Sequence, residues 1–148
     1  MMWLWLLMLG CVKVVEVNGF VEQRDDQTVL TIADGRTTPL DLGEHTVLRA
    51  LDGYLVELEA WDTRKGFIVR DWKVRSGLSG FQVWLGHPQV TPMGLGFWDA
   101  QNDVLLPVAA QARATLQEHL GQTMVLEGWI EQDVGLRVVA YRALDVNP

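Results

Sequence analysis

The nonapeptide GYLVELEAW at Gly53–Trp61 recurs in the second half of the chain as GQTMVLEGW at Gly121–Trp129, 68 residues later. Two flanking blocks repeat at nearly the same offset. VNG at 17–19 corresponds to WLG at 84–86, and GFIVRDWKV at 66–74 corresponds to GLRVVAYRA at 135–143. Three collinear blocks with almost one offset indicate that the chain contains two copies of a single unit.

Each copy has the pattern of a small β domain. In the first copy, VVEVNGFVE at 14–22 and TVLTIAD at 28–34 alternate or run apolar with many β-branched residues, which is typical of strands. Asp34-Gly35 is a strong signal for a tight hairpin. The repeated nonapeptide and the block after it predict two more strands in each copy.

A helix is expected just before the repeated nonapeptide in both copies. Apolar residues at helical spacing predict a short helix at 44–51 and a longer one at 108–120 that begins after Pro107. Gly53 and Gly121 follow these helices, at a position where a left-handed C-cap favours glycine. Each copy therefore reads as three strands, a helix and two strands.

This element order resembles the OB-fold, a small five-stranded barrel with a helix between its third and fourth strands. The resemblance implies a mainly β protein made of two tandem OB-like barrels. The small residues of SGLSG at 76–80 are typical of a linker. We expect one unit at 14–76, a linker at 77–80 and a second unit at 81–148. The alternative is a single β-sandwich formed by both halves.

The first ten residues, MMWLWLLMLG, have no counterpart in the repeat and precede the only cysteine, Cys11. An uncharged run this short cannot cross a bilayer as a helix, which needs about 20 residues, but its length is typical of a signal-peptide apolar region. Met8-Leu9-Gly10-Cys11 resembles the cleavage motif of bacterial lipoproteins, although the usual cation before the apolar region is absent. The alternative is a hydrophobic first strand with a buried thiol.

The lipoprotein resemblance implies a location as well as a modification. Residues 1–10 would be a signal peptide and residues 11–13 a lipid-anchor junction, with acyl chains on Cys11 that hold the protein to a membrane. Val12, rather than an aspartate, follows the cysteine. By analogy with the family, this implies an outer-membrane lipoprotein of the bacterial cell envelope that faces the periplasm.

Charge and residue spacing argue against several functions. The chain has 19 acidic and 12 basic residues and a net charge of −7, which repels nucleic-acid phosphates in the absence of a basic patch. A single cysteine cannot form an intrachain disulfide framework or a cysteine zinc site. His45, His87 and His119 lie 42 and 32 residues apart and lack the spacing of a helical zinc motif. We therefore predict no catalytic residues, no metal site and no cofactor.

The candidate binding residues are aromatic and acidic side chains of the repeated strands. Alternation along a strand places a glutamate and a tryptophan of each copy on the outer face. Such a pair could bind a sugar ring or an extended peptide. Its alternative role is packing in a core or between the barrels. The full candidate set also includes the aromatics of the last strands: Glu59, Trp61, Trp72, Glu127, Trp129 and Tyr141.

Together these observations predict a membrane-anchored binding or scaffolding protein with an envelope protein or a glycan as its partner. Its alternative function is oligonucleotide or oligosaccharide binding. A cytoplasmic oligonucleotide-binding module would require residues 1–10 to belong to the fold. It would also require the scattered arginines and lysines to form a cationic groove. Lys73 and Arg142 follow Trp72 and Tyr141 directly, an order that suits stacking on a nucleobase.

Overall fold

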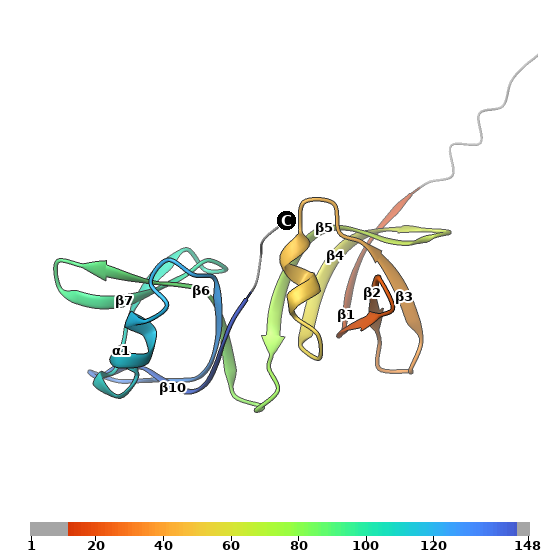
Figure 1. The fold of residues 1–148 in the computed structure, drawn as a ribbon. Helices are drawn as coiled ribbons and strands as arrows, with labels where there is room; N and C mark the ends of the chain where they lie inside the picture. Colours follow the sequence, from red (N-terminus) through yellow and green to blue (C-terminus); the bar gives the residue numbers. More distant parts are fainter. Residues whose placement is uncertain (1–11, 145–148) are drawn as a thin grey trace, which may run out of the picture.

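The computed structural model describes residues 12–144, so Cys11 and the predicted signal peptide lie outside the described part. The chain is mainly β, as the sequence predicted, and folds into two five-stranded units that lie side by side (Figure 1). Unit 1 contains β1 (Lys13–Arg24), β2 (Gln27–Thr31), β3 (Thr37–Asp41), the 3₁₀ helix η1 (Thr46–Ala50), β4 (Leu55–Thr63) and β5 (Gly66–Ser76). Unit 2 contains β6 (Gln82–Thr91), β7 (Gly94–Asp99), β8 (Val104–Pro107), α1 (Ala110–Gln117), β9 (Met124–Glu131) and β10 (Gly135–Ala143).

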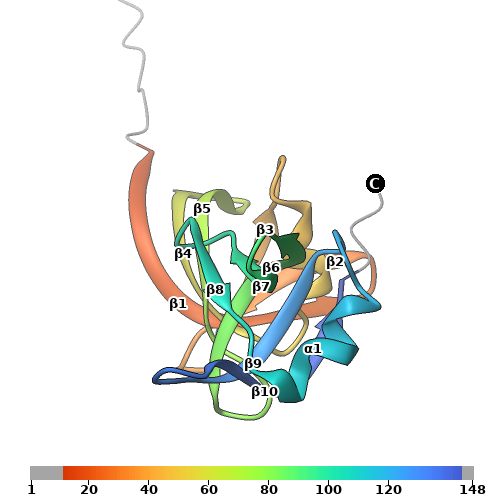
Figure 2. The ribbon, with the colours of Figure 1, turned by 90° about the vertical axis from the view of Figure 1, so that its left-hand side faces the viewer.

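Unit 1 is a closed barrel with the strand order β1-β2-β3-β5-β4. The long first strand, β1, curves strongly (Figure 2), so that it pairs with β4 along its first part and with β2 along its second. Gly19 lies where the two pairings meet, and a methyl group there would come within 2.8 Å of the Thr31 carbonyl oxygen. A glycine at this bend therefore lets neighbouring strands approach closely.

Unit 2 has the same strand order but does not close, so the expectation of a second closed barrel is wrong. A single parallel bridge, Val108 to Leu136, stands where unit 1 joins Leu40 to Phe67. Helix α1 occupies the remaining gap. The side-chain amide of Gln111 donates to the Val138 carbonyl oxygen at 2.9 Å and accepts from its N–H at 3.4 Å, which replaces part of the missing strand pairing.

The two units share their irregularities as well as their strand order. In both, the last strand has a bulge at the same repeat position, at Arg70 in β5 and at Val139 in β10. Gly66 and Gly135 open these strands with φ of 132° and 111°. At both positions a methyl group would collide with the carbonyl of a proline in the third strand. These shared features support the duplication inferred from the sequence.

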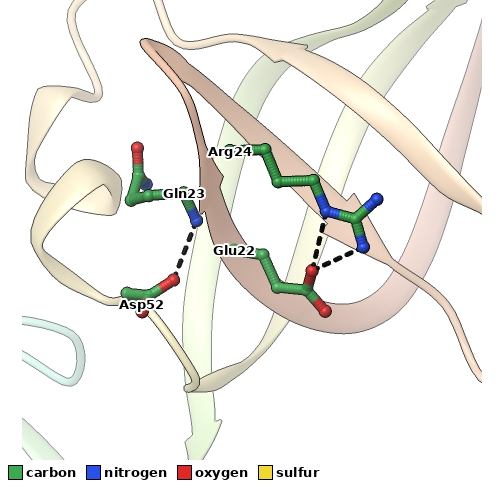
Figure 3. A network of polar contacts seen from close by, with 4 residues as sticks. All are labelled: Glu22, Gln23, Arg24 and Asp52. Carbon is green, nitrogen blue, oxygen red and sulfur yellow. Dashed lines mark hydrogen bonds and ion pairs between the residues drawn. The ribbon is translucent and has the colours of Figure 1, made fainter.

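Both helices lie between the third and fourth strands of their units, as predicted, but they are shorter than the expected 44–51 and 108–120. Gly53 and Gly121 follow them with φ of 85° and 72°, so the predicted left-handed positions are confirmed. In unit 1, the turn after η1 is tied to the end of β1, because Asp52 accepts a hydrogen bond of 2.8 Å from the Gln23 N–H (Figure 3). Within residues 12–144, neither helical segment is long and apolar enough to span a bilayer.

The units pack against each other along a seam between unit 1 and the outer face of β6 and β9. Val83, Leu85 and Val125 on that face belong to the same buried cluster as Tyr54 and Val74 of unit 1. On the other face of the same strands, Trp84, Met124 and Leu126 belong to a separate core of unit 2. β6 and β9 are thus covered on both sides. The single-sandwich alternative is wrong, because the first sheet closes on itself around its own core.

Candidate functional site

Trp61, near the end of β4, is 41% exposed, so its indole is not part of the barrel core. Val56, Leu58 and Ala60 on the opposite face of β4 are fully buried, as the predicted alternation requires. Because the equivalent strand of unit 2 repeats this arrangement at Trp129, each unit presents one indole to solvent.

The Trp61 ring is covered by a cation. The Arg70 guanidinium lies 5.2 Å from the ring centroid, a distance typical of a cation–π contact. Arg70 also pairs with Glu59 at 2.7 Å. The polar groups beside Trp61 therefore satisfy one another, and they shield one face of the indole.

Trp129 in β9 is 42% exposed and has a different environment. The Phe81 ring lies beside it, with centroids 5.7 Å apart and planes tilted by 32°. Val139 takes the bulge position that Arg70 holds in unit 1, and it is 46% exposed. Phe81, Trp129 and Val139 form what we call the aromatic patch. The charged neighbour across the strand pair, Arg137, is already paired with Glu131.

Glu127 does not lie exposed beside Trp129 as a ligand contact would; it takes the alternative role, packing under another segment of the chain. The side chain is 4% exposed, and its carboxylate accepts hydrogen bonds from the Ser79 N–H at 2.9 Å and the Ser79 hydroxyl at 2.7 Å. It also lies against Gly77, where a methyl group would overlap it. Glu127 therefore fixes the segment between β5 and β6, whereas its repeat equivalent, Glu59, is half-buried at the surface beside Arg70.

The aromatic residues of the last strands are placed unequally. Trp72 is half-buried and packs against the core of unit 1, while Tyr141 is 50% exposed with its ring 5.7 Å from that of His119. Arg142, which would supply positive charge only in the oligonucleotide-binding alternative, crosses the seam. It bonds the Ala50 carbonyl oxygen and lies 5.1 Å from the Tyr54 ring centroid.

The seam includes residues that the sequence reasoning missed. Val83, Leu85 and Val125 stand at the same repeat positions as Glu16, Asn18 and Glu57 of unit 1. The apolar set is covered by unit 1, whereas Glu16 and Asn18 are exposed and Glu57 is half-buried beside Arg75. The sequence did contain a signal for this seam. These outer-face positions are apolar in one copy and polar in the other, which indicates that the face is covered in only one of them.

Titratable groups form no cluster suited to metal binding in residues 12–144, where no group of three His, Cys, Asp or Glu side chains has that arrangement. Asp99 uses its carboxylate to accept from the N–H groups of Gln101 and Asn102, which stabilises a turn. Burial raises the pKa of the Tyr54 phenol at the seam, and the nearby Arg142 charge partly offsets that effect.

Comparisons with protein-family models, curated proteins and solved structures gave no match to this chain. The geometry of the two exposed tryptophans and of the seam is thus what supports a function.

Proposed function

We propose that this chain is a non-catalytic binding module that docks a protein partner on the aromatic patch of unit 2. The main observation is that Trp129, at 42% exposure, lies beside the Phe81 ring and that no cation of residues 12–144 lies over its own ring. Val139, the repeat equivalent of Arg70, is apolar and 46% exposed. Tryptophan anchors surrounded by apolar contacts are the residues that contribute most to protein interfaces. Trp61 is the internal comparison, because Arg70 and Glu59 already occupy its surroundings.

A protein partner fits this patch better than a sugar or a nucleic acid. A sugar ring needs polar groups that are free to bond its hydroxyls, but Arg137 and Glu131 beside Trp129 bond each other. A nucleic acid needs cations along its backbone, and the chain carries a net charge of −7. An apolar side chain needs only desolvated surface, which Phe81, Trp129 and Val139 provide.

Site-specific photocrosslinking tests this proposal. With p-benzoylphenylalanine in place of Phe81, we expect one discrete crosslinked protein in cells, and Trp129→Ala should reduce its yield about tenfold or more. Trp61→Ala is the matched control and should leave the yield unchanged. The same photoreactive residue at Phe20, which is 48% exposed in unit 1, should give no such product.

Two results would contradict a protein partner. One is an equal loss of crosslinking with Trp61→Ala and Trp129→Ala. The other is sedimentation of the purified chain with protein-free peptidoglycan sacculi that disappears in Trp129→Ala, which would assign the aromatic patch to a glycan.

We also propose that the module is held to a bacterial envelope membrane by acyl chains on Cys11. The support is the resemblance of Met8-Leu9-Gly10-Cys11 to a lipoprotein cleavage motif. Intact-mass spectrometry after expression in a bacterium should show a chain that begins at Cys11 with added acyl mass, and Cys11→Ala should abolish the processing. An unmodified full-length wild-type chain would refute the anchor.

A further inference from the structure

A second surface feature lies at the seam, where a hollow of about 350 Å³ is lined by Arg49 and Ala50 of unit 1 and by Arg142, Ala143 and Leu144 of unit 2. Its volume falls within the range of small-ligand pockets. Two guanidinium groups from different units border it, and among residues 12–144 no acidic residue lines it. The hollow is thus cationic in a chain that is acidic overall.

The two arginines beside the hollow differ from most other arginines of the chain, which form ion pairs with carboxylates. Of the nine arginines in the chain, five pair with a carboxylate: Arg24, Arg36, Arg70, Arg75 and Arg137. Arg49 and Arg142 are two of the four that form no ion pair within the described residues. The chain has 19 acidic side chains, yet neither arginine beside this hollow forms an ion pair with a described one. The hollow therefore carries a local positive charge.

Arg142 is held in place by neutral groups. It donates to the Ala50 carbonyl oxygen and lies over the Tyr54 ring, and within the described part of the chain its buried Nε has no hydrogen-bond partner. No carboxylate of the described residues forms an ion pair with Arg142, although the charge of the buried Glu127 acts on the same Tyr54 phenol. The fixed guanidinium is therefore preorganised for an anion. Arg49 is exposed and also borders a hollow of about 460 Å³ that Asp26 and Asp41 help to line, yet it pairs with neither.

We propose that the Arg49–Arg142 hollow binds an oxyanion, a phosphate or carboxylate group, across the seam between the two units. Guanidinium groups match such anions with parallel N–H donors. Because one arginine comes from each unit, the bound anion links the units. This site is separate from the aromatic patch and does not depend on the function proposed for it.

NMR titration of the purified chain with inorganic phosphate tests the site directly. Phosphate should shift the Nε–Hε signals of Arg49 and Arg142 in a saturable manner. Arg49→Gln should weaken the affinity about tenfold, and Arg49→Glu should abolish binding. Arg64→Gln is the matched control, because Arg64 is also exposed, forms no ion pair in the described structure and lies in the β4–β5 turn. It should leave the affinity unchanged.

The source of the anion is distinguished by a vesicle arm. Flotation with phosphatidylglycerol vesicles, but not with phosphatidylcholine vesicles, that depends on Arg49 would identify a lipid headgroup. Binding of free phosphate without flotation would identify a soluble ligand. Shifts that do not saturate with phosphate, or an equal loss of affinity in Arg49→Gln and Arg64→Gln, would overturn the proposal.

Discussion

Replacing Glu127 by alanine should destabilise the folded chain by about 3 kcal/mol. The magnitude follows from the two hydrogen bonds that the carboxylate accepts from Ser79, since a bond to a charged group contributes about 1.5 kcal/mol or more. Glu59 occupies the same repeat position in unit 1, but it is only half-buried and makes a surface ion pair with Arg70. Glu59→Ala should therefore cost less than about 1 kcal/mol.

Gly77 provides an internal check on this reasoning. A methyl group at Gly77 would overlap the Glu127 side chain, so Gly77→Ala should cost about 1–3 kcal/mol in the wild-type chain, as overpacking does. In the Glu127→Ala chain the overlapping atoms are gone. The same substitution should then change the stability by less than about 0.5 kcal/mol.

Urea unfolding of the four chains of this double-mutant cycle, followed by tryptophan fluorescence and far-ultraviolet circular dichroism, measures the coupling. We expect a coupling of at least about 1 kcal/mol between positions 77 and 127, with unchanged m-values. Equal costs of Gly77→Ala in both backgrounds, or a Glu127→Ala cost no larger than that of Glu59→Ala, would refute the role assigned to Glu127.

Three further perturbations are checked by the same urea assay. Gly135→Ala should cost about 3 kcal/mol, because φ is 111° and the new methyl group meets the Pro107 carbonyl, whereas Gly35→Ala, with φ of 83° and open space, should cost about 1 kcal/mol. Burial raises the folded-state pKa of Tyr54 above about 10, so the stability gained from its neutral phenol is present below that pH and is lost as the pH rises through the folded pKa. Tyr54→Phe should remove this alkaline loss. Arg142→Gln should cost about 2 kcal/mol through the lost carbonyl and aromatic contacts.

The order of strands and helix along the chain was predictable because the two copies repeat one sequence pattern. Gly53 and Gly121 marked the helix ends in both copies, and their positive φ values confirm the positions. The alternation of β4 was predictable too, since a barrel strand has one covered face.

The sequence could not predict the environment of residues whose partners lie far away along the chain. Strand alternation correctly placed Glu127 opposite the core of unit 2, but it cannot say whether another part of the chain covers that face. Here Ser79 and Gly77 do. The contacts of Arg142 were equally beyond a reading of neighbouring residues, because its partners, Ala50 and Tyr54, lie about 90 residues earlier.

The unequal faces of the two units have a consequence for assembly. The seam joins unlike surfaces, the outer face of β6 and β9 in unit 2 and the Tyr54 region of unit 1. A contact between unlike surfaces of one repeat can continue without limit and produce fibres. A further unit stacked on unit 1 by the same contact would cover the face that carries Glu16, Asn18 and Glu57. A further unit stacked on unit 2 would contact Gln122, which occupies the repeat position of Tyr54.

Each end of the pair is therefore polar where the interior contact is apolar, as in the terminal caps of solenoid proteins. We expect these polar residues to disfavour the addition of a third unit by the same contact. A chain with Val, Leu and Val in place of Glu16, Asn18 and Glu57 would have an exposed apolar surface on unit 1. We expect such a chain to polymerise head to tail once a complementary Tyr54-like surface is also supplied at Gln122.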